Sequence, residues 1–290
     1  VLETLIPALT AKAAGETLPT HVTNIQADGI QRVNLIDATP IGINVRSTVA
    51  TYSDVLDILR RSYARTDAAA AEGLKMSDFS YNTGSLRCPV CDGTGQISLD
   101  VQFLPDVDIA CPDCRGSRYS DEANAIRRPE KGKPANQALS LPELLSLSVD
   151  EALPHVADVK KANEKLQTLH DLGLGYLTLG EATPALSGGE AQRLKLASEM
   201  GRGQEDAVFV FDEPTIGLHP RDVETLLAVF QRLVEQGATV VVIEHDLDFI
   251  ANADYVIDMG PHGGSNGGRV VACCTPAEIA ANPNSITGRY

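Results

Sequence analysis

An octapeptide, Leu-Ser-Gly-Gly-Glu-Ala-Gln-Arg at 186–193, holds the residue types of an anion-binding helix start. Ser187 can cap the helix with its hydroxyl group, and Gly188 and Gly189 let the backbone approach a ligand closely. Because a helix N-terminus carries roughly +0.5 charge, it can face an anion such as a γ-phosphate. The alternative is an ordinary Ser-capped helix without a ligand, and the elements that follow disfavour it.

Two carboxylates follow a short apolar run at 207–211. The run has no helical period, which is typical of a strand buried on both faces in a parallel sheet. Asp212 and Glu213 therefore sit at the carboxyl end of a strand, the edge at which open α/β sheets bind ligands. A carboxylate there can hold Mg²⁺, and its neighbour can orient the water that attacks a phosphoryl group. We assign Asp212 to the metal and Glu213 to the water.

A second apolar run, at 238–243, predicts another buried strand, and it ends in Glu-His-Asp. Between the two runs, Pro220 begins a predicted amphipathic helix that Gly237 ends. His245 follows the second strand, where an imidazole can hydrogen-bond a γ-phosphate. A lone histidine is more often structural, but the strand-end position favours the ligand-binding interpretation.

Four cysteines form two Cys-x-x-Cys pairs, Cys88 with Cys91 and Cys111 with Cys114. Each pair can present two thiolates to one ion, and a hairpin of about twenty residues between the pairs would complete a tetrahedral Cys₄ zinc shell. With four ligands and no open position, such a site is structural. Two disulfides would need an oxidising compartment, and a redox pair would need a strand–helix context that is missing here.

These segments together resemble the UvrA family, the damage-recognition ABC ATPases of bacterial nucleotide excision repair. The quoted segments are the signature at 186–193, the magnesium and D-loop region at 211–219, the switch histidine at 243–245 and the glycine-rich stretch at 260–268. Signature and strand motifs alone would fit any ABC ATPase. The zinc module upstream of the signature, with Phe-Leu-Pro-Asp-Val at 103–107 inside its hairpin, narrows the resemblance to UvrA. DnaJ-type chaperones share the knuckle but lack the ATPase signature.

The resemblance implies roles for individual residues and their partners. Nucleotide would be bound by Ser187, Gly188, Gly189, Glu190, Gln192 and Asp212; Glu213 and His245 would be catalytic; and Cys88, Cys91, Cys111 and Cys114 would hold zinc. The implied cofactors are ATP, Mg²⁺ and Zn²⁺. The implied partners are double-stranded DNA, an N-terminal ATPase half, a second copy in a homodimer, and the excision-repair subunits UvrB and UvrC.

A phosphate-cradling loop of the form Gly-x-x-x-x-Gly-Lys-Ser/Thr does not occur in the 290 residues. In the UvrA family this loop precedes a helix that resembles Val1 to Ala14, so we expect a truncated or split protein whose loop lies upstream. The segment at 32–42 resembles the strand and Q-loop of the family, except that Ala38 stands where the family has a glutamine. That departure favours a paralogue, and it puts the chain's own magnesium site in doubt. The chain alone is predicted to be inactive.

Net charge limits how the chain can meet nucleic acid. The formal net charge is −15 and the pI is near 4.8, the wrong sign for DNA binding over the whole surface. The most basic segment is 115–133, which contains six Lys and Arg residues and three Asp and Glu residues, a local net charge of +3. Such a run is often only a solvated face. No apolar run is long enough to span a membrane, so we expect a cytoplasmic protein.

The predicted fold is α/β, a partial ABC-type P-loop NTPase without its Walker A loop. Residues 1–52 and 165–290 would form the ATPase core, and 53–164 an inserted signature and zinc subdomain with the zinc module at 86–119. Within the insert, helices are expected at 54–63 and 141–149, and a further helix at 159–172 is expected to connect the insert to the core. Two functions follow: an ATP-driven DNA-damage or drug-adduct scanner, and a zinc-stabilised interaction module whose ATPase activity is degenerate.

Overall fold

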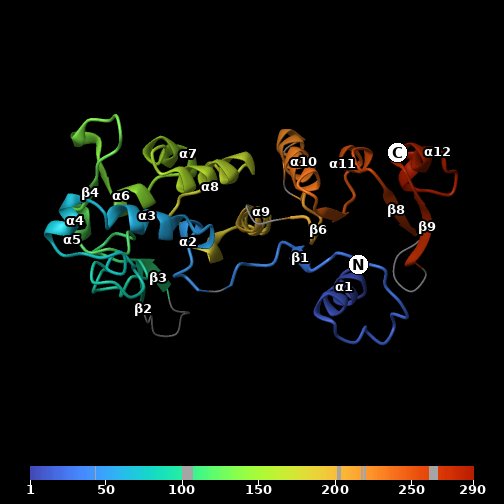
Figure 1. Ribbon diagram of the computed structural model, residues 1–290, viewed down its shortest axis with the longest axis horizontal. Helices are drawn as coiled ribbons and strands as arrows, with labels where there is room; N and C mark the ends of the chain where they lie inside the picture. Colours follow the sequence, from blue (N-terminus) through green and yellow to red (C-terminus); the bar gives the residue numbers. More distant parts are fainter. Residues whose placement is uncertain (43, 100–106, 201–203, 217, 219, 261–266) are drawn as a thin grey trace. The chain divides into compact units, whose positions relative to one another are not determined.

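The computed structural model describes residues 1–290 except 43, 100–106, 201–203, 217, 219 and 261–266 (Figure 1). Its contacts divide the chain into two compact units, and each is described by itself. The core unit comprises Val1–Asp37 and Gly203–Tyr290, and the helical unit comprises Ala38–Arg202. The sequence-based boundaries of the ATPase core and its insert, near 52 and 164, stay a prediction.

A parallel three-stranded sheet lies at the centre of the core unit, in the order β1 (Arg32–Ile36), β6 (Ala207–Asp212) and β7 (Thr239–Ile243). The middle strand, β6, is buried from Ala207 to Phe211, as its continuous apolar run predicts. Strand β7 is only half-buried along most of its length, whereas the sequence predicts a fully buried strand. Within the described residues β7 pairs on one side only, which leaves its residues at a sheet edge.

Helices cover both faces of this sheet. On one face, Leu9 of α1 (Leu5–Ala14) packs with Val208 and Val210 of β6. The alternate residues of β6 point to the other face, because side chains alternate along a strand. There Phe211 lies 4.3 Å, between ring centroids, from Phe230 of α10 (Pro220–Glu235), and Phe230 lies 5.6 Å from Phe249 of α11 (Leu247–Ala251). The arrangement is the predicted α/β fold.

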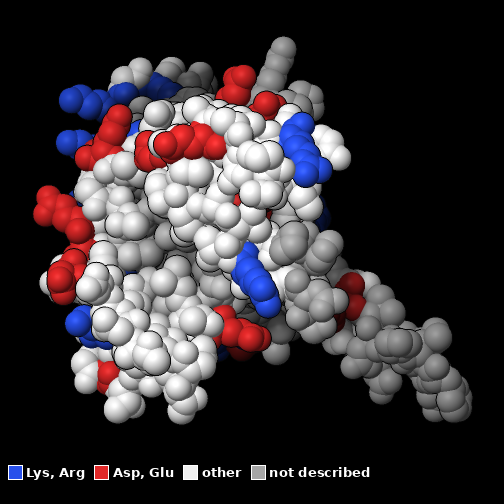
Figure 2. All heavy atoms as spheres, turned by 90° about the vertical axis from the view of Figure 1, so that its right-hand side faces the viewer, with Lys and Arg blue, Asp and Glu red and all other residues white. Residues whose placement is uncertain are grey.

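A separate antiparallel hairpin, β8 (Val256–Gly260) with β9 (Arg269–Cys274), completes the core unit together with α12 (Pro276–Ala281) and a 3-10 turn at Thr287–Arg289. On its packed side, Asp258 accepts hydrogen bonds from Ser285 Oγ at 2.6 Å and Thr287 Oγ1 at 3.0 Å. Four large side chains of the hairpin region are more than half exposed: Tyr255, Ile257, Met259 and Val270. Figure 2 is viewed from the right-hand side of Figure 1, where the hairpin is drawn, and it shows a broad area of residues other than Lys, Arg, Asp and Glu.

The helical unit is built of short helices around buried leucines. The predicted helices at 54–63 and 159–172 are found as α3 (Val55–Tyr63) and α8 (Lys160–Asp171). The helix expected at 141–149 is two helices, α6 (Leu141–Leu145) and α7 (Val149–Ala152), because Ser140 and Ser148 each start a capping box of their own.

Apart from the 12-residue helix at Gly188–Glu199, the other elements of this unit are short. They are α2 (Val49–Tyr52), α4 (Asp67–Ala71), β2 (Gln96–Leu99), β3 (Val107–Ala110), α5 (Glu122–Ala125), β4 (Arg127–Arg128), β5 (Leu139–Ser140), α9 (Gly188–Glu199) and 3-10 turns at Ala135–Gln137, Leu153–His155 and Thr183–Ala185. Strands β2 and β3 pair as an antiparallel hairpin, and so do β4 and β5. Across the described part of the whole chain, every helix is too short or too polar to cross a membrane.

Candidate functional site: a four-cysteine centre, a signature helix and a strand-end carboxylate cluster

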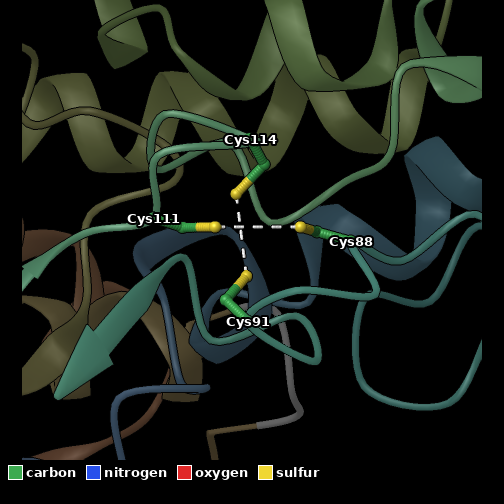
Figure 3. Close-up of side chains that lie close together, drawn as sticks. All are labelled: Cys88, Cys91, Cys111 and Cys114. Carbon is green, nitrogen blue, oxygen red and sulfur yellow. Dashed lines mark hydrogen bonds between the residues drawn. The ribbon is translucent and has the colours of Figure 1, made fainter.

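The four predicted zinc ligands converge on one point in the helical unit (Figure 3). Cys88 Sγ lies 3.9 Å from Cys111 Sγ, and Cys91 Sγ lies 3.6 Å from Cys114 Sγ. A tetrahedral ion with Zn–S bonds of about 2.3 Å places its sulfurs about 3.8 Å apart, so both distances fit a zinc shell. The four thiols are buried, and hairpin β2–β3 joins the two pairs as the spacing predicts.

The two knuckles repeat the same backbone turn. After Cys91 the left-handed residues are Asp92, Gly93 and Gly95; after Cys114 they are Arg115, Gly116 and Arg118. A side chain at Gly93 would meet the carbonyl oxygen of Tyr81 at 1.7 Å, so only glycine fits there. The N–H of Gly95 points at Cys91 Sγ from 3.3 Å, which is a donor suited to a thiolate. The turns thus aim both cysteines of each pair inward.

The thiols do not share one environment. Burial raises the pKa of Cys88 and raises that of Cys114 to about 12. Burial also opposes ionisation of Cys91, but the Gly95 N–H, the neighbouring thiols and the Gly93 N–H outweigh it and lower its pKa to about 7. A metal ion supplies the positive charge that four clustered thiolates need.

Arg118 and Tyr81 tie the zinc module to the segment before α2. The Arg118 side chain is buried, lies over the Tyr81 ring at 5.3 Å and donates to the Val45 carbonyl oxygen at 2.9 Å. The Tyr81 hydroxyl donates to the Arg46 carbonyl oxygen at 3.0 Å and lies 3.1 Å from Thr48 Oγ1. The zinc module and the signature helix both belong to the helical unit.

The predicted signature forms the start of α9. Ser187 is the N-cap, its hydroxyl accepts the Glu190 N–H at 3.4 Å, and the Glu190 carboxylate accepts the Ser187 N–H at 2.6 Å. This reciprocal capping box orders the first turn of the helix. A side chain at Gly188 would meet Ala38 Cβ at 3.1 Å, so the departure from the family's Q-loop glutamine lies directly beside the signature. Gln192 is buried, with 3% of its surface exposed, and faces the interior of this unit.

The predicted catalytic pair meets at the strand ends of the core unit. Glu213 follows β6 in a left-handed conformation (φ 48°), and its N–H donates to the Ile243 carbonyl oxygen at 2.9 Å. His245 Nε2 lies 3.4 Å from Glu213 Oε1, and 80% of the His245 side chain is exposed. A non-glycine residue with positive φ is strained, and such strain concentrates at functional sites. Asp212 ends β6 next to this pair, in register with Ile243.

Sequence reasoning gave no role to Glu244, which organises this edge. One carboxylate oxygen accepts the N–H of Thr215 at 3.0 Å and also its hydroxyl, and the other accepts the N–H groups of His245 at 2.6 Å and Asp246 at 3.1 Å. Burial opposes the charge of Glu244, but these donors outweigh it and lower the pKa. Glu244 thereby connects the turn after β6 to the turn after β7.

Glu244→Ala should therefore destabilise the core unit. The substitution leaves the N–H groups of Thr215, His245 and Asp246 without their acceptor, at an expected cost of about 1–3 kcal/mol. Urea unfolding at neutral pH measures the change. Glu235→Ala, at the exposed end of α10, is the matched control and should shift the free energy of unfolding by less than about 0.5 kcal/mol. Equal urea unfolding midpoints for the two variants would show that Glu244 does not stabilise the core unit.

The basic segment at 115–133 is less available than its sequence indicates. Arg128 is buried and pairs with Asp158 at 2.8 Å, Arg127 pairs with Glu143, and Lys133 pairs with Glu130 at 2.6 Å. Arg118 is buried in the zinc module as described above. Four of the six basic side chains are thus engaged within the protein, and this favours the structural interpretation of the run over a continuous DNA-binding surface.

Some predictions fall on residues outside the described part of the chain. They concern the D-loop residues Gly217 and His219, most of the glycine-rich stretch at 260–268, and the Phe-Leu-Pro-Asp stretch at 103–106 of the zinc hairpin.

Comparison with known proteins gives close relatives in both sequence and structure. The chain is 47% identical over 264 residues to the UvrABC system protein A of Aquifex aeolicus and 46% identical over 264 residues to that of Bacillus subtilis, covering 91% of this chain in each case. The crystal structure of UvrA2 from Deinococcus radiodurans superimposes with a TM-score of 0.86 at 40% identity, over 97% of this chain and 34% of that one. The chain spans 28% and 27% of the two curated relatives. No protein-family model matches the chain.

Proposed function

Because this chain belongs to the UvrA family of ABC ATPases, we propose that it supplies part of an ATP site that drives DNA binding and damage recognition in nucleotide excision repair. The single observation that carries the proposal is the strand-end cluster, in which Glu213 and His245 lie 3.4 Å apart beside Asp212. That is the arrangement needed to hold a metal ion, orient water and contact a γ-phosphate.

The signature helix has the complementary role. Its capped first turn offers the backbone N–H groups of Gly188 and Gly189 to a phosphate. In ABC ATPases a signature completes a nucleotide site whose phosphate loop belongs to another domain. We therefore propose that Ser187, Gly188 and Gly189 contact a nucleotide whose phosphates are bound by the phosphate loop of another domain. Asp212 is proposed to bind Mg²⁺.

The four-cysteine centre is proposed to hold one structural Zn²⁺. Its sulfur spacing, its burial and its two repeated turns support this assignment. The ion would fix the knuckles and leave no coordination position for a substrate.

Partners and location are proposed from the family. They are double-stranded DNA, a second copy of the protein, UvrB and UvrC, in the cytoplasm. Few basic side chains of the 115–133 segment are left unengaged, so contact with DNA would be local and strongly salt-dependent. The second candidate, an interaction module with degenerate ATPase activity, is favoured by Ala38 beside Gly188.

The 290-residue chain alone should hydrolyse ATP at the rate of the buffer blank. None of its residues forms a Gly-x-x-x-x-Gly-Lys-Ser/Thr loop, and the strand-end cluster cannot act on a phosphate that is not held in place. Phosphate release under excess Mg·ATP measures this. A longer polypeptide that carries such a loop ahead of this chain should show turnover. Turnover by the purified short chain that is lost in Glu213→Gln would contradict the prediction.

A further inference from the structure

Tyr176 contacts the signature helix from a different part of the helical unit. Its hydroxyl donates to one carboxylate oxygen of Glu190, while the other oxygen accepts the Ser187 N–H at 2.6 Å. Glu190 is the third residue of α9, so its carboxylate bridges the phenol and the backbone at the helix start. Tyr176 is 61% exposed, and this hydrogen bond, more than burial, gives its side chain a defined position.

The backbone that presents Tyr176 is held firmly. The Gly175 carbonyl oxygen accepts the Asp150 N–H at 3.0 Å, and the Leu177 carbonyl oxygen accepts the Val149 N–H at 2.9 Å. A side chain at Gly175 would lie 2.3 Å from the Asp150 carboxylate, and Leu177 is buried. The first turn of α7 therefore fixes the residues on both sides of Tyr176.

The phenol remains a donor at neutral pH. Partial burial, with the hydrogen bond and negative charge of Glu190, raises the pKa of Tyr176 to about 12. Burial opposes the charge of Glu190, but Tyr176 and Ser187 outweigh it and lower its pKa. When the Glu190 carboxylate is fixed on the Ser187 N–H, the amides of Gly188 and Gly189 remain free to bind an incoming anion. A Glu190 carboxylate that moves freely would compete with the anion for these amides.

We infer that Tyr176 is a positioning residue for the signature helix: it locks the Glu190 carboxylate in the capping box so that the Gly188 and Gly189 N–H groups stay available to a phosphate. The inference rests on the proposed function for its consequence, but its geometry stands without nucleotide. Tyr176 acts through its hydrogen bond to the Glu190 carboxylate.

The geometry is tested in the 290-residue chain by amide hydrogen exchange in Tyr176→Phe. The Ser187 amide should exchange about three- to tenfold faster, since the Glu190 carboxylate loses the hydrogen bond from the phenol, while amides in the middle of α8 should not change. Tyr255→Phe is the matched control. Tyr255 is 58% exposed and likewise donates one hydrogen bond, to the Cys273 carbonyl oxygen at 2.8 Å. An unchanged Ser187 amide in Tyr176→Phe overturns the inference.

The consequence is tested in the longer polypeptide with a phosphate loop. Tyr176→Phe should raise the KM for ATP about three- to fivefold and leave kcat within twofold. The reason is that the lost interaction stabilises bound ATP and the transition state equally. A merely structural role would lower the active fraction and hence kcat. In the Glu190→Gln background, Tyr176→Phe should add less than twofold, whereas additive effects would overturn action through Glu190. The proposed function is tested separately. It fails if ATP turnover does not depend on Glu213, and this outcome is independent of the hydrogen-exchange result at Ser187.

Discussion

Cys88→Ser is expected to abolish zinc binding and to destabilise the zinc module by more than about 3 kcal/mol. The substitution removes one of four ligands whose sulfurs all lie within 4.8 Å of one another, and it leaves three buried thiols around an incomplete shell. An ion that binds the folded module more tightly than the unfolded chain would add its differential binding free energy to the free energy of unfolding.

Elemental analysis of the gel-filtered chain measures this outcome. The parent should carry one zinc ion per chain and Cys88→Ser well below one, with a lower unfolding midpoint. Cys273→Ser is the control, because Cys273 is an exposed cysteine of β9 in the core unit, outside the cluster. It should keep the metal and the midpoint. A parent without zinc whose stability Cys88→Ser leaves unchanged would eliminate the Cys₄ assignment.

The effect should extend beyond the knuckles. Gly93 packs against the Tyr81 carbonyl oxygen, and the Tyr81 hydroxyl meets the backbone at Arg46. Arg118, in the second knuckle, donates to Val45. Since the module is linked by these contacts to the segment before α2, loss of the ion should loosen that segment as well.

Local patterns account for what the sequence predicts well. The run at 207–211, the two Cys-x-x-Cys pairs and the signature each contain their own determinants, so β6, the β2–β3 hairpin and the Ser187 capping box follow from neighbouring residues. Helix α8 is predicted for the same reason, from its periodic apolar face, and α3 lies where a helix is expected at 54–63.

Contacts between distant residues account for what the sequence misses. Tyr176 and Glu190 are 14 positions apart, and Thr215 and Glu244 are 29 apart, and no local motif marks either pair. The partners of the basic run at 115–133 are missed for the same reason, because Arg128 pairs with Asp158, which lies outside the run. Strand β7 is partly exposed because it lies at the edge of the described sheet. The order of strands in a sheet cannot be predicted from one apolar run.

Glu213→Gln should lower ATP turnover by about 10²–10³-fold in the longer polypeptide that carries a phosphate loop. The carboxylate that orients and deprotonates water is replaced by an amide of the same shape, which cannot take the proton. The left-handed backbone at this position (φ 48°) and the Glu213 N–H bond to Ile243 are retained, so folding should not change. Asp212, the proposed magnesium ligand, is also retained, so the KM for ATP should stay within about threefold.

Steady-state phosphate release at saturating Mg·ATP measures the effect, and unfolding midpoints confirm equal folding of the variants. Glu235→Gln makes the same chemical change at the exposed end of α10 and should keep full turnover. Turnover in Glu213→Gln within twofold of the parent would eliminate the ATPase mechanism. A parent that shows no turnover at all would instead favour the zinc-stabilised interaction module, whose Cys₄ centre lies in the helical unit and does not depend on Glu213.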